Sequence, residues 1–394
     1  MSGSDPKVPY FSIGRRAGEI PELDGLRGIA ILLVLLRHAT HPIVEERGNL
    51  LGVGAWDISI PLLNGWMGVD LFFVLSGFLI THHLLKRWPK RVDRSFMLRY
   101  WSKRVLRTFP AYYAAVAIAL IGLVPLFETN VSDIRYTLTV HLLFLQDYLG
   151  SDLVAAFWSL GVEEKFYLLC PLVLVRLRRH PLMRRLSVLV FLAILPLILR
   201  LITLISNEGL LLNYEAFFWT VRSPFHLAMD GLWVGVICAF IYRSDYFAAG
   251  DRKRVLRPAC NASLIVFGVL LVGAAWFDDM LFFPSIIVLN VVSIAFGGVL
   301  LSVSCGDTLI NGLLRSRWLR KLSVLSYSVY LLHLMLVPLS LALLGMMVDS
   351  DSLSPLALLT AFAPLFFALS LVAGAVLHFT VEKPFLLLKD RIRM

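Results

Sequence analysis

The chain has 394 residues, 58% of them hydrophobic, and a mean hydropathy of +0.77. Soluble globular proteins average about 45–50% apolar residues, so the composition excludes that class and indicates a polytopic membrane protein. The net charge of +10 would suit a nucleic-acid partner. However, Lys and Arg gather in alternate connections between apolar segments, as in the cytoplasmic loops of membrane proteins, so no nucleic-acid partner is expected.

The apolar segments predict an all-α integral membrane protein with about ten transmembrane helices. They lie at 28–44, 64–85, 108–127, 155–175, 186–206, 222–242, 258–276, 281–303, 323–345 and 355–379. Residues 1–20 are assigned to a cytoplasmic N-terminal tail, 21–385 to the transmembrane domain and 386–394 to a cytoplasmic C-terminal tail. Both termini are placed in the cytoplasm because the connections on that side hold nearly all of the Lys and Arg. Tyr136–Leu145 is apolar but too short to span, so it is expected to be re-entrant or interfacial.

The four cysteines lie in or beside apolar runs without CxxC spacing. This pattern favours packing residues over a disulfide framework or a zinc site, and no metal is expected. The cysteines are Cys170, Cys238, Cys260 and Cys305.

The first helix places an arginine and a histidine in an apolar run. Glu22–His41 reads ELDGLRGIAILLVLLRHATH, and Arg27 and His38 are eleven residues apart. On a helix they share one face, roughly 16 Å apart along the axis. An ionisable side chain at the centre of a membrane helix costs about 2.5–3.5 kcal/mol, which makes His38 a candidate catalytic residue. The alternative is a histidine that only bonds to a neighbouring helix.

The second segment carries Asp70 near its outer end and a small pair, Ser76 and Gly77, in its middle. A carboxylate beside a membrane imidazole can fix its tautomer, so Asp70 is a second catalytic candidate. Small residues let helices approach closely, and we interpret Ser76 and Gly77 as packing residues.

Two further clusters carry charge. Arg104 and Arg107 share a helix face, and either meet lipid headgroups or bind phosphates. The fourth segment holds Glu163, Glu164 and Lys165 in or near the hydrocarbon. Such residues could neutralise each other or line an aqueous cavity, and a functional role is favoured.

Five motifs, taken together, resemble those of the acyltransferase-3 family of integral-membrane acyltransferases. They are Arg27 with His38, GVDLFFVLSGFLI from Gly68 to Ile80, RxxR at Arg104 and Arg107 followed by Pro110 and Tyr112, WSLxVEExFY from Trp158 to Tyr167, and SYSxYLxH from Ser326 to His333. The resemblance implies ten core helices, a cytoplasmic acyl-CoA donor, and transfer of an acyl group, commonly acetyl, to a hydroxyl. The chain departs from the family pattern at Lys165, where relatives often have Gln, and at His82 and His83.

From the residues and the resemblance we expect an acetyl-CoA-dependent O-acetyltransferase in the bacterial cytoplasmic (inner) membrane. The donor phosphates would bind Arg27, Arg104, Arg107 and Tyr112. His38 would act as general base or transient acyl carrier, aided by Asp70 and by Glu163 or Glu164. The acceptor, an extracytoplasmic carbohydrate or lipid-linked glycan, would meet Trp66, Trp158, Tyr330 and His333, with further outer aromatics Trp56, Phe217 and Trp219.

The alternative is a transporter or exporter in which His38, Glu163 and Glu164 relay protons. Against it, no repeat relates the two halves of the sequence, and a transporter gives no reason for the arginine cluster.

Overall fold

The computed structural model describes residues 20–53, 56–89, 92–207, 214–244, 252–273, 282–304, 308 and 310–392. The predicted tail 1–20, apart from Ile20, lies outside these ranges, as do Cys305 and the side chain of Cys260. Cys170 and Cys238 are buried free thiols.

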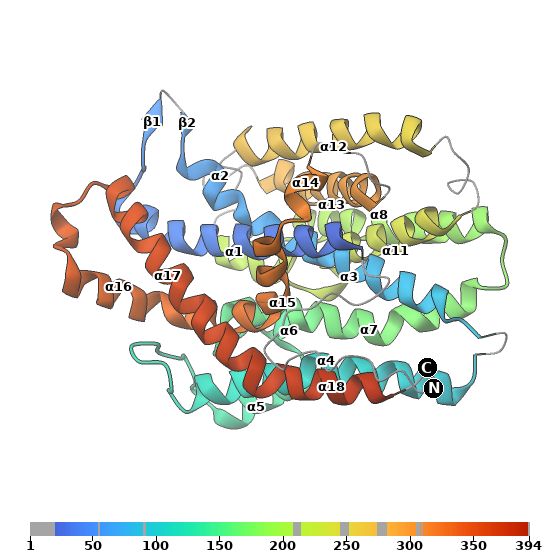
Figure 1. The fold of residues 1–394 in the computed structure, drawn as a ribbon, viewed down its shortest axis with the longest axis horizontal. Coiled ribbons are helices and arrows are strands. Elements are labelled where there is room, and N and C mark those ends of the chain that lie inside the picture. Colours follow the sequence, from blue (N-terminus) through green and yellow to red (C-terminus); the bar gives the residue numbers. More distant parts are fainter. Residues whose placement is uncertain are drawn as a thin grey trace, which may run out of the picture.

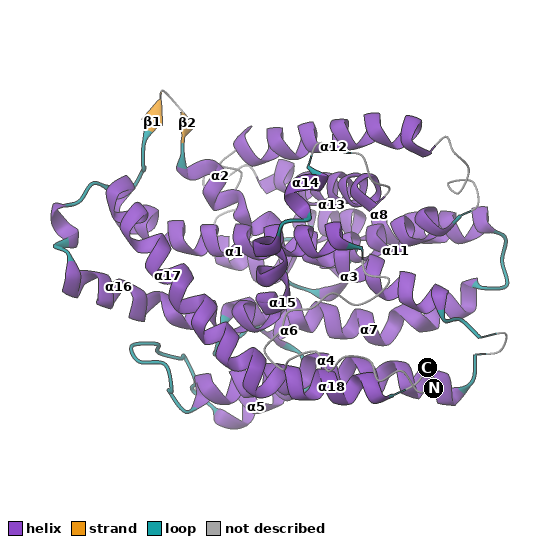
Figure 2. Cartoon of the chain, viewed as in Figure 1, coloured by secondary structure: helices purple, strands orange, loops and turns teal. Residues whose placement is uncertain are grey.

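The described chain is almost entirely helical (Figure 2). The longer helices are α1 (Pro21–Arg47), α3 (Met67–Lys86), α4 (Arg94–Leu120), α7 (Trp158–Leu177), α8 (Leu182–Ile205), α11 (Asp230–Arg243), α12 (Arg252–Gly273), α13 (Phe282–Ser304), α15 (Arg317–Leu332), α16 (Leu336–Met347), α17 (Pro355–Leu377) and α18 (Lys383–Arg391). The shorter ones are α2 (Ser59–Leu63), α5 (Ile134–Leu142), α6 (Gln146–Leu149), α9 (Tyr214–Phe217), α10 (Phe225–Ala228) and α14 (Asn311–Leu314). Single 3₁₀ or π turns lie at Asn64–Trp66, Ala155–Phe157, Phe218–Arg222, His333–Met335, Ser350–Ser352 and His378–Glu382. Strands β1 (Gly52–Val53) and β2 (Trp56–Asp57) pair antiparallel.

Six helical stretches in the described chain are long and apolar enough to cross a bilayer, so this is a multi-pass membrane protein. They are Pro21–Arg47, Ser59–Lys86, Leu182–Ile205, Ile286–Ser304, Arg317–Met347 and Pro355–Arg391. The other predicted segments overlap α4, α7, α11 and α12. The number of spans and the side of each terminus therefore stay predictions. Helix α5 has 9 residues, too few to span the hydrocarbon.

Local sequence signals explain where helices begin. Helix α1 has Pro21 in its first turn together with Glu22 and Asp24, which favour the positive end of the helix dipole. At α4 the Asp93 carboxylate accepts a 2.7 Å hydrogen bond from the Phe96 amide, and this bond holds the pKa of the Asp93 carboxyl below its ordinary value.

Helix α1 runs through the middle of the molecule and belongs to two hydrophobic cores (Figure 1). Leu26 and Ala30 of its first half belong to a core that also holds residues of α3, α7, α8, α11 and α13. Val34 and Leu35 of its second half belong to a core that also holds residues of α4, α15, α16 and α17. Its direct neighbours include α3, α13, α15 and α17. Arg27 in the first half and His38 in the second half are therefore held on a helix that is packed in the protein interior.

Helices α3 and α11 cross closely because each presents a glycine. A Cβ on Gly77 would lie 2.0 Å from the Leu232 carbonyl oxygen, and one on Gly235 would lie 2.1 Å from the Val74 carbonyl oxygen. The predicted packing role of Gly77 is confirmed. For Ser76 it is wrong: the neighbouring position on the helix faces away from α11, and its hydroxyl bonds to Glu163 instead.

Candidate active site

A cavity of about 440 Å³ lies among α1, α3, α4, α7, α15 and α18. Its wall on α3 consists of residues three or four apart, from Val69 and Phe72 through Ser76 to His83 and Arg87, which form one helix face. With a rise of about 1.5 Å per residue, the wall from Phe72 to Arg87 is roughly 22 Å long. The cavity is therefore an elongated channel along α3.

The end of this channel near Arg87 is cationic. Arg27, Lys86, Arg87, Lys103, Arg104 and Arg107 line it. Arg104 lies over the rings of Tyr100 and Tyr167 at 5.8 and 5.9 Å. Arg27 approaches Asp24 only to 3.8 Å. In the described part of the chain neither Arg104 nor Arg107 forms an ion pair, and the Arg104 Nε is buried without a hydrogen-bond partner. Guanidiniums in this state are suited to bind a phosphate-bearing ligand.

The three consecutive ionisable residues of α7 point to three different places, because successive helical residues turn by about 100°. Glu163 lines the cavity and accepts hydrogen bonds from Ser76 at 2.8 Å and Tyr167 at 2.6 Å. Glu164 interacts with Thr108 of α4 and does not line the cavity. Lys165 bonds to Asp147 of α6 at 2.6 Å. Of the three, only Glu163 belongs to the cavity.

The opposite end of the channel ends at Tyr330, next to a pair of histidines. The Tyr330 hydroxyl lies 2.7 Å from that of Ser159, and its ring centroid lies 5.5 Å from that of His333. The His333 Nε2 atom lies 3.3 Å from the His38 Nδ1 atom. Tyr330 lines the cavity, whereas His38 and His333 are not part of the lining: His333 contacts Tyr330, and His38 contacts His333. The structure thus brings three predicted site residues together.

Asp70 forms a separate cluster. It accepts a 2.7 Å hydrogen bond from Arg222, whose guanidinium lies 5.6 Å from the Trp66 ring and 5.2 Å from the Trp158 ring. Three predicted site residues, Asp70, Trp66 and Trp158, therefore surround Arg222. Among the described residues no carboxylate bonds to the His38 ring, so the expected pairing of Asp70 with His38 is not formed here.

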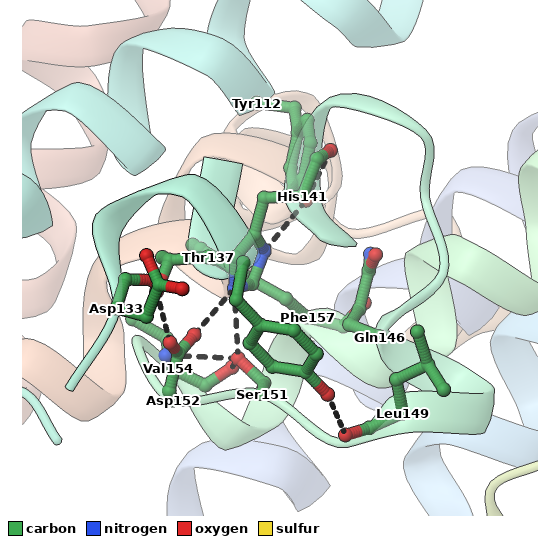
Figure 3. A network of polar contacts seen from close by, with 11 residues as sticks. Tyr112, Asp133, Thr137, His141, Gln146, Leu149, Ser151, Asp152, Val154 and Phe157 are labelled. Carbon is green, nitrogen blue, oxygen red and sulfur yellow. Dashed lines mark hydrogen bonds and ion pairs between the residues drawn. The ribbon is translucent and has the colours of Figure 1, made fainter. Parts of the chain in front are cut away.

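Tyr112 is also away from the cavity. Figure 3 shows it directed at His141 of α5, and its hydroxyl lies 3.1 Å from the His141 Nδ1 atom. The His141 Nε2 atom in turn lies 3.3 Å from Asp152, which also accepts from Thr137. Tyr112 is fully buried and does not line the cavity, so in this structure it joins α4 to α5. Its donor-binding role stays a prediction.

Sequence reasoning missed several cavity residues. Ser159 and Tyr327 lie in motifs that were recognised, but no function was assigned to them. A signal was available, because each is a polar side chain in an otherwise apolar membrane segment. No cluster of three or more metal-ligating side chains occurs in the part of the chain that the structure describes.

The sequence of this chain was compared with protein families and with curated proteins, and the matches are acyltransferases. Residues 20–378 match the family described as an acyltransferase domain. A Listeria monocytogenes peptidoglycan O-acetyltransferase is 23% identical, with 82% of this chain and 50% of that protein aligned. A Bacillus subtilis protein, provisionally named a peptidoglycan O-acetyltransferase, is 25% identical over 82% of this chain and 49% of that protein. A Staphylococcus aureus protein, provisionally named an O-acetyltransferase, is 27% identical over 43% of this chain and 27% of that protein.

The chain thus spans about half or less of the length of these curated relatives. No solved structure matches it. The family match extends from Ile20, just before α1, to the end of α17. It includes both histidines, the arginine cluster and all of the channel lining except Lys389 and Asp390 of α18. On this evidence the chain belongs to the acyltransferase-3 family.

Proposed function

We propose that this protein is a membrane O-acyltransferase. It moves an acyl group, with acetyl the first choice, from cytoplasmic acyl-CoA to a hydroxyl of an extracytoplasmic carbohydrate or lipid-linked glycan. The observation that carries the proposal is the channel with unpaired arginines at one end and Tyr330, beside His333 and His38, at the other.

The donor fits this channel by charge and length. Coenzyme A carries phosphates at one end and its thioester at the end of a long, uncharged arm. Arg104, Arg107 and Arg27 supply charge-assisted hydrogen bonds for the phosphates. The wall of about 22 Å along α3 then accommodates the arm, with the thioester toward Tyr330.

His38 supplies the chemistry at that end. As a general base it takes the proton of the acceptor hydroxyl while the oxygen attacks the thioester carbonyl carbon. The carbon–sulfur bond then breaks, and the coenzyme A thiolate receives the proton. As a nucleophile it would instead carry the acyl group as an acyl-imidazole and pass it to the acceptor in a second step. Ping-pong kinetics or a trapped acyl-His38 would support the second route.

The acceptor is proposed from the relatives and from the outer aromatics. Two relatives bear names that place peptidoglycan as their acceptor. Of the predicted outer aromatics, Phe217 is fully buried, whereas Trp66 is partly buried with Arg222 5.6 Å from its ring. Trp56, 38% exposed on β2, remains open to contact with a sugar.

The test is release of free coenzyme A from acetyl-CoA by the purified protein in nanodiscs, measured together with acetyl-CoA binding. His38→Ala should lose about 10²- to 10⁴-fold in rate, the range for a general base, while still binding the donor. His226→Ala, which removes a histidine bonded to Tyr148 outside the cavity, is the matched control. Full activity of His38→Ala would refute the mechanism. Absence of both release and binding in the wild type would favour the transporter.

A further inference from the structure

The two histidines beside Tyr330 contact each other through specific nitrogens. The His38 Nδ1 atom lies 2.8 Å from the Val34 carbonyl oxygen and 3.3 Å from the His333 Nε2 atom. The His333 Nδ1 atom lies 2.7 Å from the Tyr330 carbonyl oxygen. The ring centroids are 4.9 Å apart, in an edge arrangement.

These contacts define where the ring protons are. A carbonyl oxygen can only accept a hydrogen bond, so the nitrogen facing it carries the proton. His38 therefore has its proton on Nδ1, and His333 likewise has its proton on Nδ1. The Nε2 of a neutral His333 is then an acceptor, and it faces the Nδ1–H of His38. The single Nδ1–H of His38 is thus shared, in a three-centre hydrogen bond, between the Val34 carbonyl oxygen at 2.8 Å and the His333 Nε2 atom at 3.3 Å.

We infer that His333 is a positioning residue that holds the ring of His38, through Nδ1, so that the Nε2 atom of His38 is the reactive nitrogen. In the described chain the Nε2 of His38 has no hydrogen-bond partner. The His38 side chain is partly accessible, whereas His333 is fully buried. This inference rests on the proposed function and replaces the acceptor-contacting role that the sequence suggested for His333.

The logic is that of a catalytic triad, with a neutral imidazole in place of the carboxylate. When His38 takes a proton at Nε2, its Nδ1–H becomes a stronger donor to both the His333 lone pair and the Val34 carbonyl oxygen. The proton on Nε2 then goes to the coenzyme A sulfur as the carbon–sulfur bond breaks. His333 neither gains nor loses a proton in this sequence.

A break in the helix places His333 correctly. Helix α15 ends at Leu332 and a 3₁₀ turn follows at His333–Met335. Pro338 explains the break, because proline has no N–H for the Leu334 carbonyl and its ring clashes with that carbonyl. In the tighter turn the His333 ring folds back onto the Tyr330 carbonyl and is directed at α1.

The experiment compares two substitutions of His333. His333→Gln retains an acceptor at the reach of Nε2, whereas His333→Leu fills a similar volume without one. We expect His333→Leu to lower kcat for acetyl transfer or coenzyme A release by about 10²-fold, with the KM for acetyl-CoA within about twofold of wild type. His333→Gln should recover most of that loss. In a His38→Ala background, His333→Leu should cause no further loss, because it acts through His38.

Met335→Leu is the control, since it changes a fully buried side chain of the same 3₁₀ turn and keeps its volume. If His333→Leu does not fold, the kcat of His333→Gln is compared with that of Met335→Leu. A folded His333→Gln that loses about 10²-fold in kcat while Met335→Leu keeps the wild-type value would then overturn the inference. Wild-type kcat in folded His333→Leu, or a folded His333→Gln as impaired as His333→Leu, would overturn the inference. Full activity of His38→Ala would instead overturn the proposed mechanism itself, so the two failures are distinguishable.

Discussion

The cations of the channel differ from those buried elsewhere in the protein. Lys165 pairs with Asp147 at 2.6 Å, Arg200 with Asp230 at 3.1 Å, and Arg222 with Asp70 at 2.7 Å. Arg104 and Arg107, in the described chain, have no such partner and line the cavity instead. A buried charge is tolerated when a fixed counter-charge offsets its desolvation. Arg104 and Arg107 are not held by such a pair, so hydrogen-bond donors of their guanidiniums stay available to an anionic ligand.

The largest effect should come from breaking a paired cation. Arg200 is fully buried and donates to both Asp230 and Asn290. Arg200→Leu leaves Asp230 with an unpaired charge and should cost about 3–5 kcal/mol of stability. Thermal unfolding in detergent measures it. Replacing Arg200 and Asp230 together by apolar residues should cost less, and an equal or greater loss would contradict the pairing argument.

The second prediction concerns the unpaired set. Arg104→Ala with Arg107→Ala should weaken acetyl-CoA binding by at least about 10²-fold, because each charge-assisted hydrogen bond contributes about 1.5–3 kcal/mol. The melting temperature should fall only slightly, since no ion pair is lost and only the ring contacts of Arg104 disappear. Isothermal titration with acetyl-CoA measures the first and differential scanning fluorimetry the second. Unchanged affinity would show that these arginines meet lipid headgroups.

The third prediction concerns Lys165, which stands where relatives often have Gln and which pairs with Asp147 in this structure. Lys165→Gln restores an amide beside Asp147 and should cost about 1 kcal/mol of stability, because the amide keeps a hydrogen bond but loses the charge. Burial raises the pKa of the Asp147 carboxyl above its ordinary value, and Lys165 opposes that shift. The variant should therefore be most destabilised above that pKa, where the carboxylate is charged, and less so as the pH falls.

Melting temperatures of wild type and Lys165→Gln at about pH 5 and pH 8 test this. Lys165→Met, which also removes the hydrogen bond, should be worse at the higher pH. A destabilisation that grows on acidification would show that Asp147 is not the affected group.

The smallest effect on stability should come from Asp93, which caps α4 and pairs with none of the cations compared above. Asp93→Ala removes the acceptor for the Phe96 amide at the start of α4. The pKa of the Asp93 carboxyl is lowered in the fold, so its contribution is present above the unfolded pKa and is lost as the pH falls. The melting temperature should drop slightly at neutral pH and converge with wild type in acid. Asp93→Asn, which still caps, should remain close to wild type.

Hydropathy and spacing were enough to predict the helical class, the position of most helices and the shared helix of Arg27 and His38. The hydrogen-bond partners of the buried charged side chains could not be predicted. Asp70 was expected beside His38 but bonds to Arg222, 152 residues away in sequence. A spacing rule describes which residues share a face of one helix, whereas the partner across the interface depends on how distant helices pack. Ser76 was misassigned for the same reason.

The position of α1 between two cores has a consequence for how the chain is made. Helix α1 is synthesised early, yet three of its polar contacts form only with late segments. Glu22 bonds to Arg315 across 293 residues, His38 to His333 across 295, and Arg47 to Asp351 across 304. Until ribosomal synthesis has passed Asp351, beyond α16, at least one of these side chains lacks its partner and must be solvated by water, lipid headgroups or the insertion machinery. The contact of His38 with His333 thus forms only at a late stage of biogenesis, so a prematurely terminated polypeptide would expose the first helix without the residue that we propose orients His38.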